Sequence, residues 1–263
     1  MFVVLAYVHD TGARTLVQRW RADGEDAALL TCADLSRPGW RYTGGGAPGQ
    51  AVIDGQPIAT RDIRAVITRI PAVSEAELAH VHEDDRKYAA AEMQAFLLAW
   101  LMSLECPVLN RPTPSNLGGP LGSAAQWVRR ARRLGVAARP IRQRVAYAPG
   151  AASGTDCRVD ANAILVDVVG ERAFLLGGRA PRPDEASFAQ AAVALARDAG
   201  VELLRAYFEH GSEQAPVFLE AGLWIDIAAE SVAGALLGRC RGFVQAPCEA
   251  RSPRVLAGAV VSA

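Results

Sequence analysis

Lysine is almost absent from this chain of 263 residues. Lys87 is the only lysine, and the other 27 of the 28 basic residues are arginines. Richness in alanine and arginine is typical of a GC-rich genome, and arginine often replaces lysine on protein surfaces, so composition explains most of the shortage. Whatever its cause, the shortage leaves residues 88–263 without any lysine ammonium group. An anion bound there has to be held by arginines or backbone N–H groups, and arginine binds phosphate well.

The chain also lacks a net charge and a long apolar segment. Its 28 basic and 28 acidic residues balance, which gives no general attraction to nucleic acid or to an anionic membrane. No apolar run reaches the roughly 18 residues of a membrane span. Residues 1–6 have no basic region of the kind that opens a signal peptide. The sequence therefore predicts a cytoplasmic, bacterial protein that binds neither nucleic acid nor membrane.

Paired cysteines are missing as well, because no two of the five have C-x-x-C spacing. An odd count excludes a complete set of disulfides, so we expect reduced thiols. Cys106 lies at the end of an apolar segment with no histidine near it in sequence, which favours a buried thiol over a nucleophile. The five are Cys32, Cys106, Cys157, Cys240 and Cys248.

One segment, in contrast, concentrates positive charge. Four arginines lie within five residues, and at helical spacing they predict a solvated helix face, with an anion-binding or partner-binding patch as the alternative. They are Arg129, Arg130, Arg132 and Arg133.

Short apolar runs alternate with helical patterns along the first half of the chain. The strand-like runs are nearly continuous in apolar residues, as in a parallel sheet with both faces covered. Asp54-Gly55 predicts the turn of a small hairpin. This alternation predicts an open α/β sheet. The expected strands are residues 2–8, 28–35 and 62–70, with a helix at 13–22 and the hairpin at 51–58.

Two helix starts follow these strands. Ser74 and Glu77 have the S-x-x-E spacing of a capping box, which predicts a helix from that point. The acidic pair at 84–85 begins a longer apolar helix that ends before Pro107. A short strand then runs into a proline-punctuated loop.

This loop, at 112–114, is the expected domain boundary. We therefore expect two domains, 1–113 and 114–263. The second has the same mixed pattern of strands and helices. Its expected elements are helices at 124–134, 187–199 and 230–239, extended segments at 140–147, 201–208 and 217–220, a small-residue loop at 148–154 and a hairpin at 163–176.

The order of several motifs resembles that of the ATP-grasp ligases. T-R-I-P at 68–71 ends an expected strand, and N-R-P at 110–112 matches the "N-x-P" step into the next lobe. Residues 123–140 resemble the helix after that step. V-F-L-E-A-G-L-W-I-D-I at 217–227 resembles the family's "f-L-E-v-N-p-x-p-d" segment. The resemblance covers nearly the whole chain and is closest to the branch that joins carboxylates to amines, which includes peptide-modifying and glutathione-synthetase-like ligases.

The resemblance implies an α/β, ATP-grasp-like fold with an N-terminal pre-ATP-grasp open sheet and a reduced C-terminal lobe. Only about twenty residues separate Arg144 from the hairpin at Ile164, where the family has the lobe that clamps ATP. The family's Mg²⁺ ligands are an Asp, a Glu and an Asn. Here Glu220 matches the Glu, but Gly222 stands at the Asn position and Tyr207 at the Asp position. One carboxylate is a poor Mg²⁺ site, so neither a metal nor a nucleotide cofactor is expected.

The same resemblance supplies a set of candidate substrate-binding residues. Glu220 is more simply interpreted as a structural carboxylate with hydrogen-bond partners, and Trp224 as a core residue. The candidates are Arg69, Asn110, Arg111, Glu220 and Trp224.

Two further segments contain residues that can carry chemistry. H-V-H-E-D-D at 80–85 is dense in potential metal ligands, but histidines two apart point to different sides of a helix, so a solvated helix junction is favoured. G-G-P-L-G at 118–122 is too short and proline-broken for a phosphate loop, and we interpret it as a hinge.

These observations lead to a function hypothesis with alternatives. We expect a non-catalytic ATP-grasp-like protein that acts as a partner, or binds a peptide or carrier, in the biosynthesis of a peptide-derived natural product. The alternative is an enzyme on a remodelled scaffold, either an amide-forming ligase or an ATP-independent catalyst for a small carboxylate held by arginines. A self-associating structural subunit, and hence a homo-oligomer, is a third reading.

Overall fold

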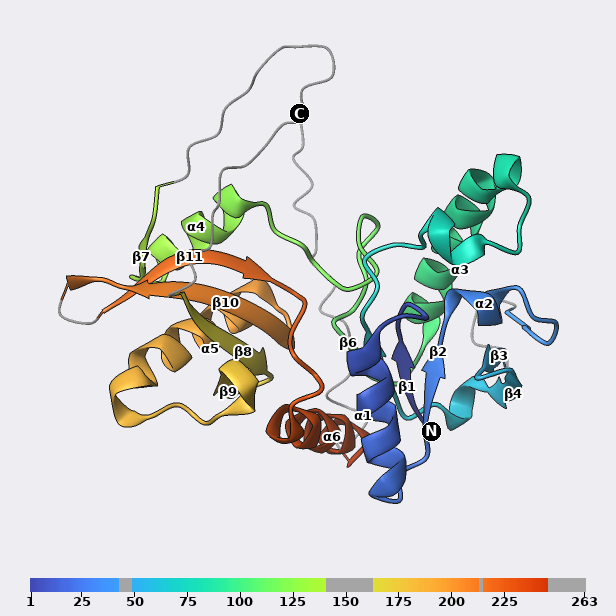
Figure 1. Cartoon of the computed structure of the whole chain (residues 1–263), viewed down its shortest axis with the longest axis horizontal. Helices are drawn as coiled ribbons and strands as arrows, with labels where there is room; N and C mark the ends of the chain where they lie inside the picture. Colours follow the sequence, from blue (N-terminus) through green and yellow to red (C-terminus); the bar gives the residue numbers. More distant parts are fainter. Residues whose placement is uncertain (43–48, 141–162, 213–214, 246–263) are drawn as a thin grey trace, which may run out of the picture.

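Two sheets of different type form the framework of the molecule (Figure 1). The computed structural model describes residues 1–42, 49–140, 163–212 and 215–245. The segment 141–162, which contains the expected extended stretch and small-residue loop, lies outside the described residues, as does Cys248.

The first sheet has four parallel strands in the order β2-β1-β5-β6. Its central strands are fully buried, since one face packs against α1 and α6 and the other against α3. Burial on both faces explains the continuous apolar sequences, such as Phe2–Leu5. The elements are β1 Phe2–Leu5, α1 Thr11–Ala22, β2 Ala27–Leu30, α2 Cys32–Leu35, β5 Ala65–Thr68, α3 Arg86–Ser103 and β6 Val108–Leu109.

The predicted hairpin is confirmed as β3 (Gln50–Ile53) and β4 (Gln56–Ala59). Asp54 and Gly55 at its turn both have positive φ, 51° and 74°, as a two-residue hairpin turn of the right twist requires.

Two local predictions in this half were wrong. The strand expected at 28–35 stops at Leu30, because Thr31 and Asp34 exchange the hydrogen bonds of a capping box and begin α2. Ser74 accepts a hydrogen bond from the Ala76 N–H, but only a 3₁₀ turn follows. Glu77 does not close a capping box, since its carboxylate accepts from the backbone N–H of Val8 at 3.0 Å.

The second sheet has five strands in the order β7-β11-β10-β8-β9 and is antiparallel except for β7. Helices α4 and α5 cover one face, where Phe188, Phe208 and Phe218 form a core. Gly200 ends α5 in the left-handed conformation at φ 68°, as the sequence predicted. The elements are α4 Ala124–Arg133, β7 Ala137–Ala138, β8 Ile164–Val169, β9 Arg172–Leu175, α5 Ala186–Ala199, β10 Leu203–His210 and β11 Pro216–Gly222.

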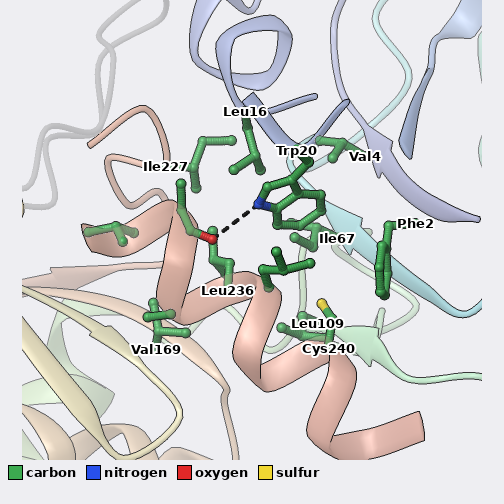
Figure 2. Close-up of a cluster of buried hydrophobic side chains, with 14 of the residues drawn as sticks. Phe2, Val4, Leu16, Trp20, Ile67, Leu109, Val169, Ile227, Leu236 and Cys240 are labelled. Carbon is green, nitrogen blue, oxygen red and sulfur yellow. Dashed lines mark hydrogen bonds between the residues drawn. The ribbon is translucent and has the colours of Figure 1, made fainter. Parts of the chain in front are cut away.

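The last helix, α6 (Glu230–Gln245), is longer than predicted and packs between the two sheets, beside α1 (Figure 1). One apolar cluster contains Val4 and Ile67 of the first sheet, Val169 of the second and Leu236 of α6 (Figure 2). The indole N–H of Trp20 donates to the carbonyl oxygen of Ala233 at 3.1 Å, which fixes α1 to α6.

Short 3₁₀ turns connect several elements. They are Thr60–Asp62, Glu75–Leu78, Glu83–Asp85, Leu176–Gly178 and Pro183–Glu185. Within the described ranges, none of the helices combines the length and the apolar character needed to cross a membrane.

Candidate functional site

A cavity of about 640 Å³ opens at the carboxyl ends of β1 and β5. From β1 the chain goes outward to β2 on one side, and on the other side it returns as β5 and β6. The carboxyl ends of β1 and β5 therefore form the topological switch point, where open parallel sheets usually bind ligands. The loop after β11 closes the cavity from the side of the second sheet.

Arg69 is the central side chain of this cavity. It follows β5, and its guanidinium Nε donates to Asp10 Oδ2 at 2.6 Å while Nη1 donates to the carbonyl oxygen of Ile225 at 3.1 Å. Its side chain is only 7% exposed. One buried arginine thus joins the first sheet to the loop that follows β11.

Asp10 positions this arginine and at the same time begins α1. Its Oδ1 accepts from the Ala13 N–H at 2.9 Å as an N-cap, and its Oδ2 receives Arg69. Aspartate is a favoured N-cap because its oxygen satisfies a free helical N–H and its charge suits the helix dipole. The sequence contained a signal for Asp10, since this carboxylate stands between the expected strand at 2–8 and the expected helix at 13–22.

Trp224 forms the outer wall of the cavity. The guanidinium carbon of Arg69 lies 4.0 Å from the centre of its ring, in cation–π geometry. The side chain is 47% exposed, so the interpretation of Trp224 as a core residue was wrong. Trp100, by contrast, is 1% exposed and belongs to the core.

A second arginine, Arg205 of β10, reaches the cavity from the other sheet. Its Nε and Nη2 donate to the two oxygens of Asp167 on β8, both at 2.6 Å. The Asp167 carboxylate raises the pKa of Arg205 above its usual value, mainly through this hydrogen bonding. Asp167 also accepts from the Asp226 N–H at 3.0 Å, which ties the loop after β11 to the sheet.

The charges of the cavity wall nearly cancel. Arg69 is paired with Asp10 and Arg205 with Asp167. Asp226 accepts only the Ala228 N–H among the described residues. Both guanidiniums thus have a carboxylate partner, so the described residues of the wall give no excess positive charge with which to attract a carboxylate substrate.

The positions that match the family's metal ligands lie on β10 and β11. Tyr207 and Glu220 are direct partners across these strands, and Gly222 pairs with Arg205. Glu220 is half-buried, and within the part of the chain described its carboxylate accepts no hydrogen bond and forms no ion pair. Its expected role as a structural carboxylate therefore stays a prediction, and it is not among the residues that line the cavity.

A divalent cation does not fit this donor set. A phenol and a glycine provide no carboxylate or amide oxygen, and the nearby Asp167 uses both its oxygens on Arg205. Mg²⁺ requires several hard oxygen ligands in octahedral array. No group of three His, Cys, Asp or Glu side chains with the geometry of a metal site occurs among the described residues.

The two remaining candidates are not brought to the cavity. Asn110 is buried, and its Oδ1 accepts from the N–H groups of Glu202 and Leu203 at 2.7 and 2.9 Å. Its Nδ2 donates to the Leu203 carbonyl oxygen at 3.0 Å. Arg111 is exposed, and its guanidinium contacts the carbonyl oxygen of Leu104 at 3.4 Å. Asn110 connects the two sheets and offers no free polar atom to a substrate in this conformation.

The surroundings of the cysteines and of the histidines at 80 and 82 do not indicate reactivity. Burial raises the pKa of both Cys32 and Cys240 to about 12, so these thiols stay protonated at neutral pH. Cys106 is half-buried, more accessible than predicted. His80 shares a hydrogen bond of 2.7 Å with Ser36, and His82 lies 3.6 Å from Asp84 at an exposed junction.

Sequence reasoning missed Asp167, Arg205 and Asp226 as components of the site. The first two are 38 positions apart and meet only because β8 and β10 are neighbours. No local pattern in the sequence predicts such a pair.

No family model matches the sequence, and no curated protein matches it. Solved structures do match the fold. The macrocyclase MdnC from Microcystis aeruginosa MRC, bound with the precursor peptide MdnA, aligns over 93% of this chain and 99% of its own at 13% identity and a TM-score of 0.63.

Two further structures agree. The ATP-grasp ligase PsnB, complexed with a minimal precursor, Mg and ADP, gives 15% identity over 91% of this chain and 98% of its own, with a TM-score of 0.61. A RiPP-associated ATP-grasp ligase from Chryseobacterium gregarium, in complex with ADP and a leader and core peptide, gives 11% identity over 90% and 96%, with a TM-score of 0.58. This chain therefore has an ATP-grasp ligase-like fold, as the motif order predicted.

Proposed function

Because the chain has the fold of peptide-modifying ATP-grasp ligases, we propose that it is a non-catalytic member of a biosynthetic assembly. It binds a peptide, or the ligase that modifies that peptide, during formation of a peptide-derived natural product. The proposal includes a cytoplasmic, bacterial setting.

The observation that carries this proposal is the pair of Arg205 and Asp167. The Asp167 carboxylate lies beside the positions where a ligase of this fold would hold Mg²⁺. Both of its oxygens accept hydrogen bonds of 2.6 Å from the Arg205 guanidinium, so they are already engaged. Phosphoryl transfer depends on the metal and on cations that neutralise the phosphates. Among the residues that the structure describes, the two arginines of the cavity wall are already paired with Asp10 and Asp167 and are not free to neutralise phosphates.

The fold supports the peptide as the ligand class. The three similar structures named above were each solved with a precursor or with a leader and core peptide. The half-exposed Trp224 at the cavity mouth adds an apolar contact surface that a side chain of a peptide can use.

An equilibrium titration of the full chain with Mg·ATP tests the first half of the proposal. We expect no heat of binding at millimolar nucleotide, and a micromolar Kd would overturn it. A titration with the peptide encoded beside its gene tests the second half. Binding of that peptide supports the partner role. So does a complex with a full-length ligase encoded by an adjacent gene, detected by a size-exclusion mass measurement. A homo-oligomer that binds neither the peptide nor the ligase contradicts it.

An enzyme acting on a small carboxylate is the second candidate function, and the position of the cavity at the switch point of the first sheet favours it. Its charge argues the other way, since no guanidinium in the wall is without a carboxylate partner. Turnover of a carboxylate that is lost in Arg69→Gln and kept in Arg111→Gln, with both variants folded by circular dichroism, would establish this candidate.

A further inference from the structure

One carboxylate in the wall of the cavity at Arg69 has no cation among the described residues. Asp226 lies on the loop after β11, is half-buried, and its Oδ1 accepts from the Ala228 N–H at 3.1 Å. Its Oδ2 has neither a hydrogen bond nor an ion pair within the described part of the chain. The backbone N–H of Asp226 donates to Asp167 at 3.0 Å, which fixes the loop to the sheet. A free carboxylate oxygen is therefore held in place beside the cavity.

This carboxylate decides the charge of the wall. The guanidiniums of Arg69 and Arg205 are each neutralised by the carboxylate that they contact. With His9 uncharged, the described residues of the wall and their ion-pair partners leave one negative charge, that of Asp226. A half-buried charge attracts a counter-charge more strongly than a charge in water does, because the solvent screens it less. The cavity therefore suits a cationic group.

An exposed aromatic ring stands two residues before this carboxylate. Trp224 is 47% exposed and lines the same cavity. The Arg69 guanidinium already lies 4.0 Å from the centre of its ring, and the exposed part of the ring can attract a second guanidinium or an ammonium group in the same way. Asp226 and Trp224 together thus offer a charge and a flat surface to one basic side chain.

The cavity borders on a leucine that is held away from the core. Leu176 begins the 3₁₀ turn after β9, is 68% exposed and lines both this cavity and an adjoining one of about 390 Å³. The Leu175 N–H donates to the Arg179 carbonyl oxygen at 2.8 Å and closes the turn. Gly178 approaches the start of α6 so closely that a Cβ there would lie 2.8 Å from that of Ala229. The fold thus fixes an apolar side chain in contact with water between two cavities, which is typical of an interaction surface.

We propose that the groove formed by these two cavities binds an extended peptide segment that carries a basic side chain beside an apolar one. The basic side chain lies between the Asp226 carboxylate and Trp224, and the apolar side chain packs on Leu176. Two adjoining cavities of about 640 and 390 Å³ hold more than a free amino acid, which favours a peptide chain. The inference rests on the proposed function and specifies which peptide is bound.

The test compares three short peptides on the full chain. The probes are acetyl-Ala-Leu-Arg-Leu-Ala-amide and its counterparts with glutamine or glutamate in place of the arginine. The indole N–H signal of Trp224, assigned with Trp224→Phe, reports binding in a nitrogen–proton correlation spectrum. We expect the arginine peptide to bind about tenfold more tightly than the glutamine peptide, the size of one charge-assisted hydrogen bond. The glutamate peptide should leave the signal in place. Equal shifts with all three probes, or no shift at millimolar concentration, would overturn the inference.

Two matched variants decide whether Asp226 or general charge is responsible. Asp226→Asn removes the charge but keeps an oxygen for the Ala228 N–H, and we expect the preference for arginine over glutamine to fall below about twofold. Glu92→Gln removes the same charge from an exposed position of α3 that lines neither cavity, and the preference should persist. An equal loss in both variants would mean a diffuse attraction to the protein surface and would contradict the site.

A second pair of variants tests the apolar contact. Leu176→Ser should weaken the arginine peptide about fivefold, since it removes part of the burial of an apolar side chain. Leu121→Ser, at a position 58% exposed that lines neither cavity, should not. N-acetylarginine amide should bind more weakly than the pentapeptide and be insensitive to Leu176→Ser. If it binds as tightly as the pentapeptide, the site takes a small cation and the peptide assignment is wrong.

These outcomes can be separated from the test of the partner role. If the peptide encoded beside the gene binds while the three probes show no preference, the proposed function stands and this inference fails. If the probes behave as expected while neither that peptide nor a neighbouring ligase binds, the cationic site stands and the proposed function fails.

Discussion

At the scale of single residues, the scarcity of lysine has a structural counterpart. Arg69 donates to a carboxylate and a carbonyl oxygen while its plane stacks on Trp224. Arg205 grips both oxygens of Asp167. A planar guanidinium can do this, whereas an ammonium group provides a point charge without a flat face. At these two positions arginine is required by geometry, whatever the genome composition contributes elsewhere.

Replacing Arg69 by methionine should destabilise the protein strongly. The change leaves the Asp10 carboxylate, only 6% exposed, without its cation, and breaking a buried pair in this way costs about 3–5 kcal/mol. The double variant Arg69→Met with Asp10→Asn should recover much of the loss, since asparagine is an equally good N-cap. Urea denaturation measures both.

The control for this prediction is Arg61→Met. Arg61 and Asp62 form an exposed pair at 3.9 Å, which is expected to contribute less than about 1 kcal/mol. An Arg69→Met variant as stable as this control would show that the Asp10 pair does not hold the loop after β11.

At the scale of elements, the molecule depends on contacts between the ends of strands. Asn110, directly after β6, bonds the backbone at the start of β10 through both its oxygen and its nitrogen. Gly119 packs on it, with φ 112° and a Cβ position only 2.5 Å from the Asn110 Cβ. The N-R-P motif resembles the family's step between lobes, and in this chain its Asn110 connects the end of β6 to the start of β10 by hydrogen bonds.

Substituting Asn110 by alanine should cost about 2–4 kcal/mol, since the N–H groups of Glu202 and Leu203 lose their acceptor in a buried place. Arg111→Ala, at the adjacent exposed position, should stay within about 0.5 kcal/mol of the parent. Thermal unfolding followed by circular dichroism compares them. Equal stabilities of the Asn110→Ala and Arg111→Ala variants would mean that water replaces the Asn110 amide and that the connection between β6 and β10 contributes little.

At the scale of the whole molecule, the two sheets share one core. Helix α6 comes last in the described chain, yet its apolar side chains share one cluster with those of β1, α1, β5 and β8 (Figure 2). The same cluster contains Leu203 of β10. Because the same side chains are buried by both sheets, the loss of this helix exposes apolar surface on each. The two halves are therefore expected to unfold together.

Truncation of Leu236 to alanine tests this coupling. Leu236 is fully buried, and such a change costs about 2–5 kcal/mol. We expect hydrogen exchange to accelerate by a similar factor at amides of β1 and of β10. Met102→Ala, at a position 53% exposed on α3, should change neither. Faster exchange confined to β10 would mean that the sheets unfold as separate domains.

The sequence by itself determined the types of most elements and their order. Continuous apolar runs required buried parallel strands, Asp54-Gly55 required a hairpin turn, and Gly200 required a helix end, because each depends on local backbone geometry or on period. Their order was enough to identify the fold. Alternative local hydrogen bonds limited how accurately the ends of elements were predicted. At Thr31, for example, a capping box ended a strand earlier than expected.

Only the tertiary structure decided the sites. Asp10 meets Arg69 across 59 positions, and Asp167 meets Arg205 across 38. Whether an arginine is free to bind an anion depends on which carboxylate the fold places beside it. For this reason the number of arginines could not show whether any of them binds an anion, whereas the packing pairs Arg69 with Asp10 and Arg205 with Asp167 at the switch point.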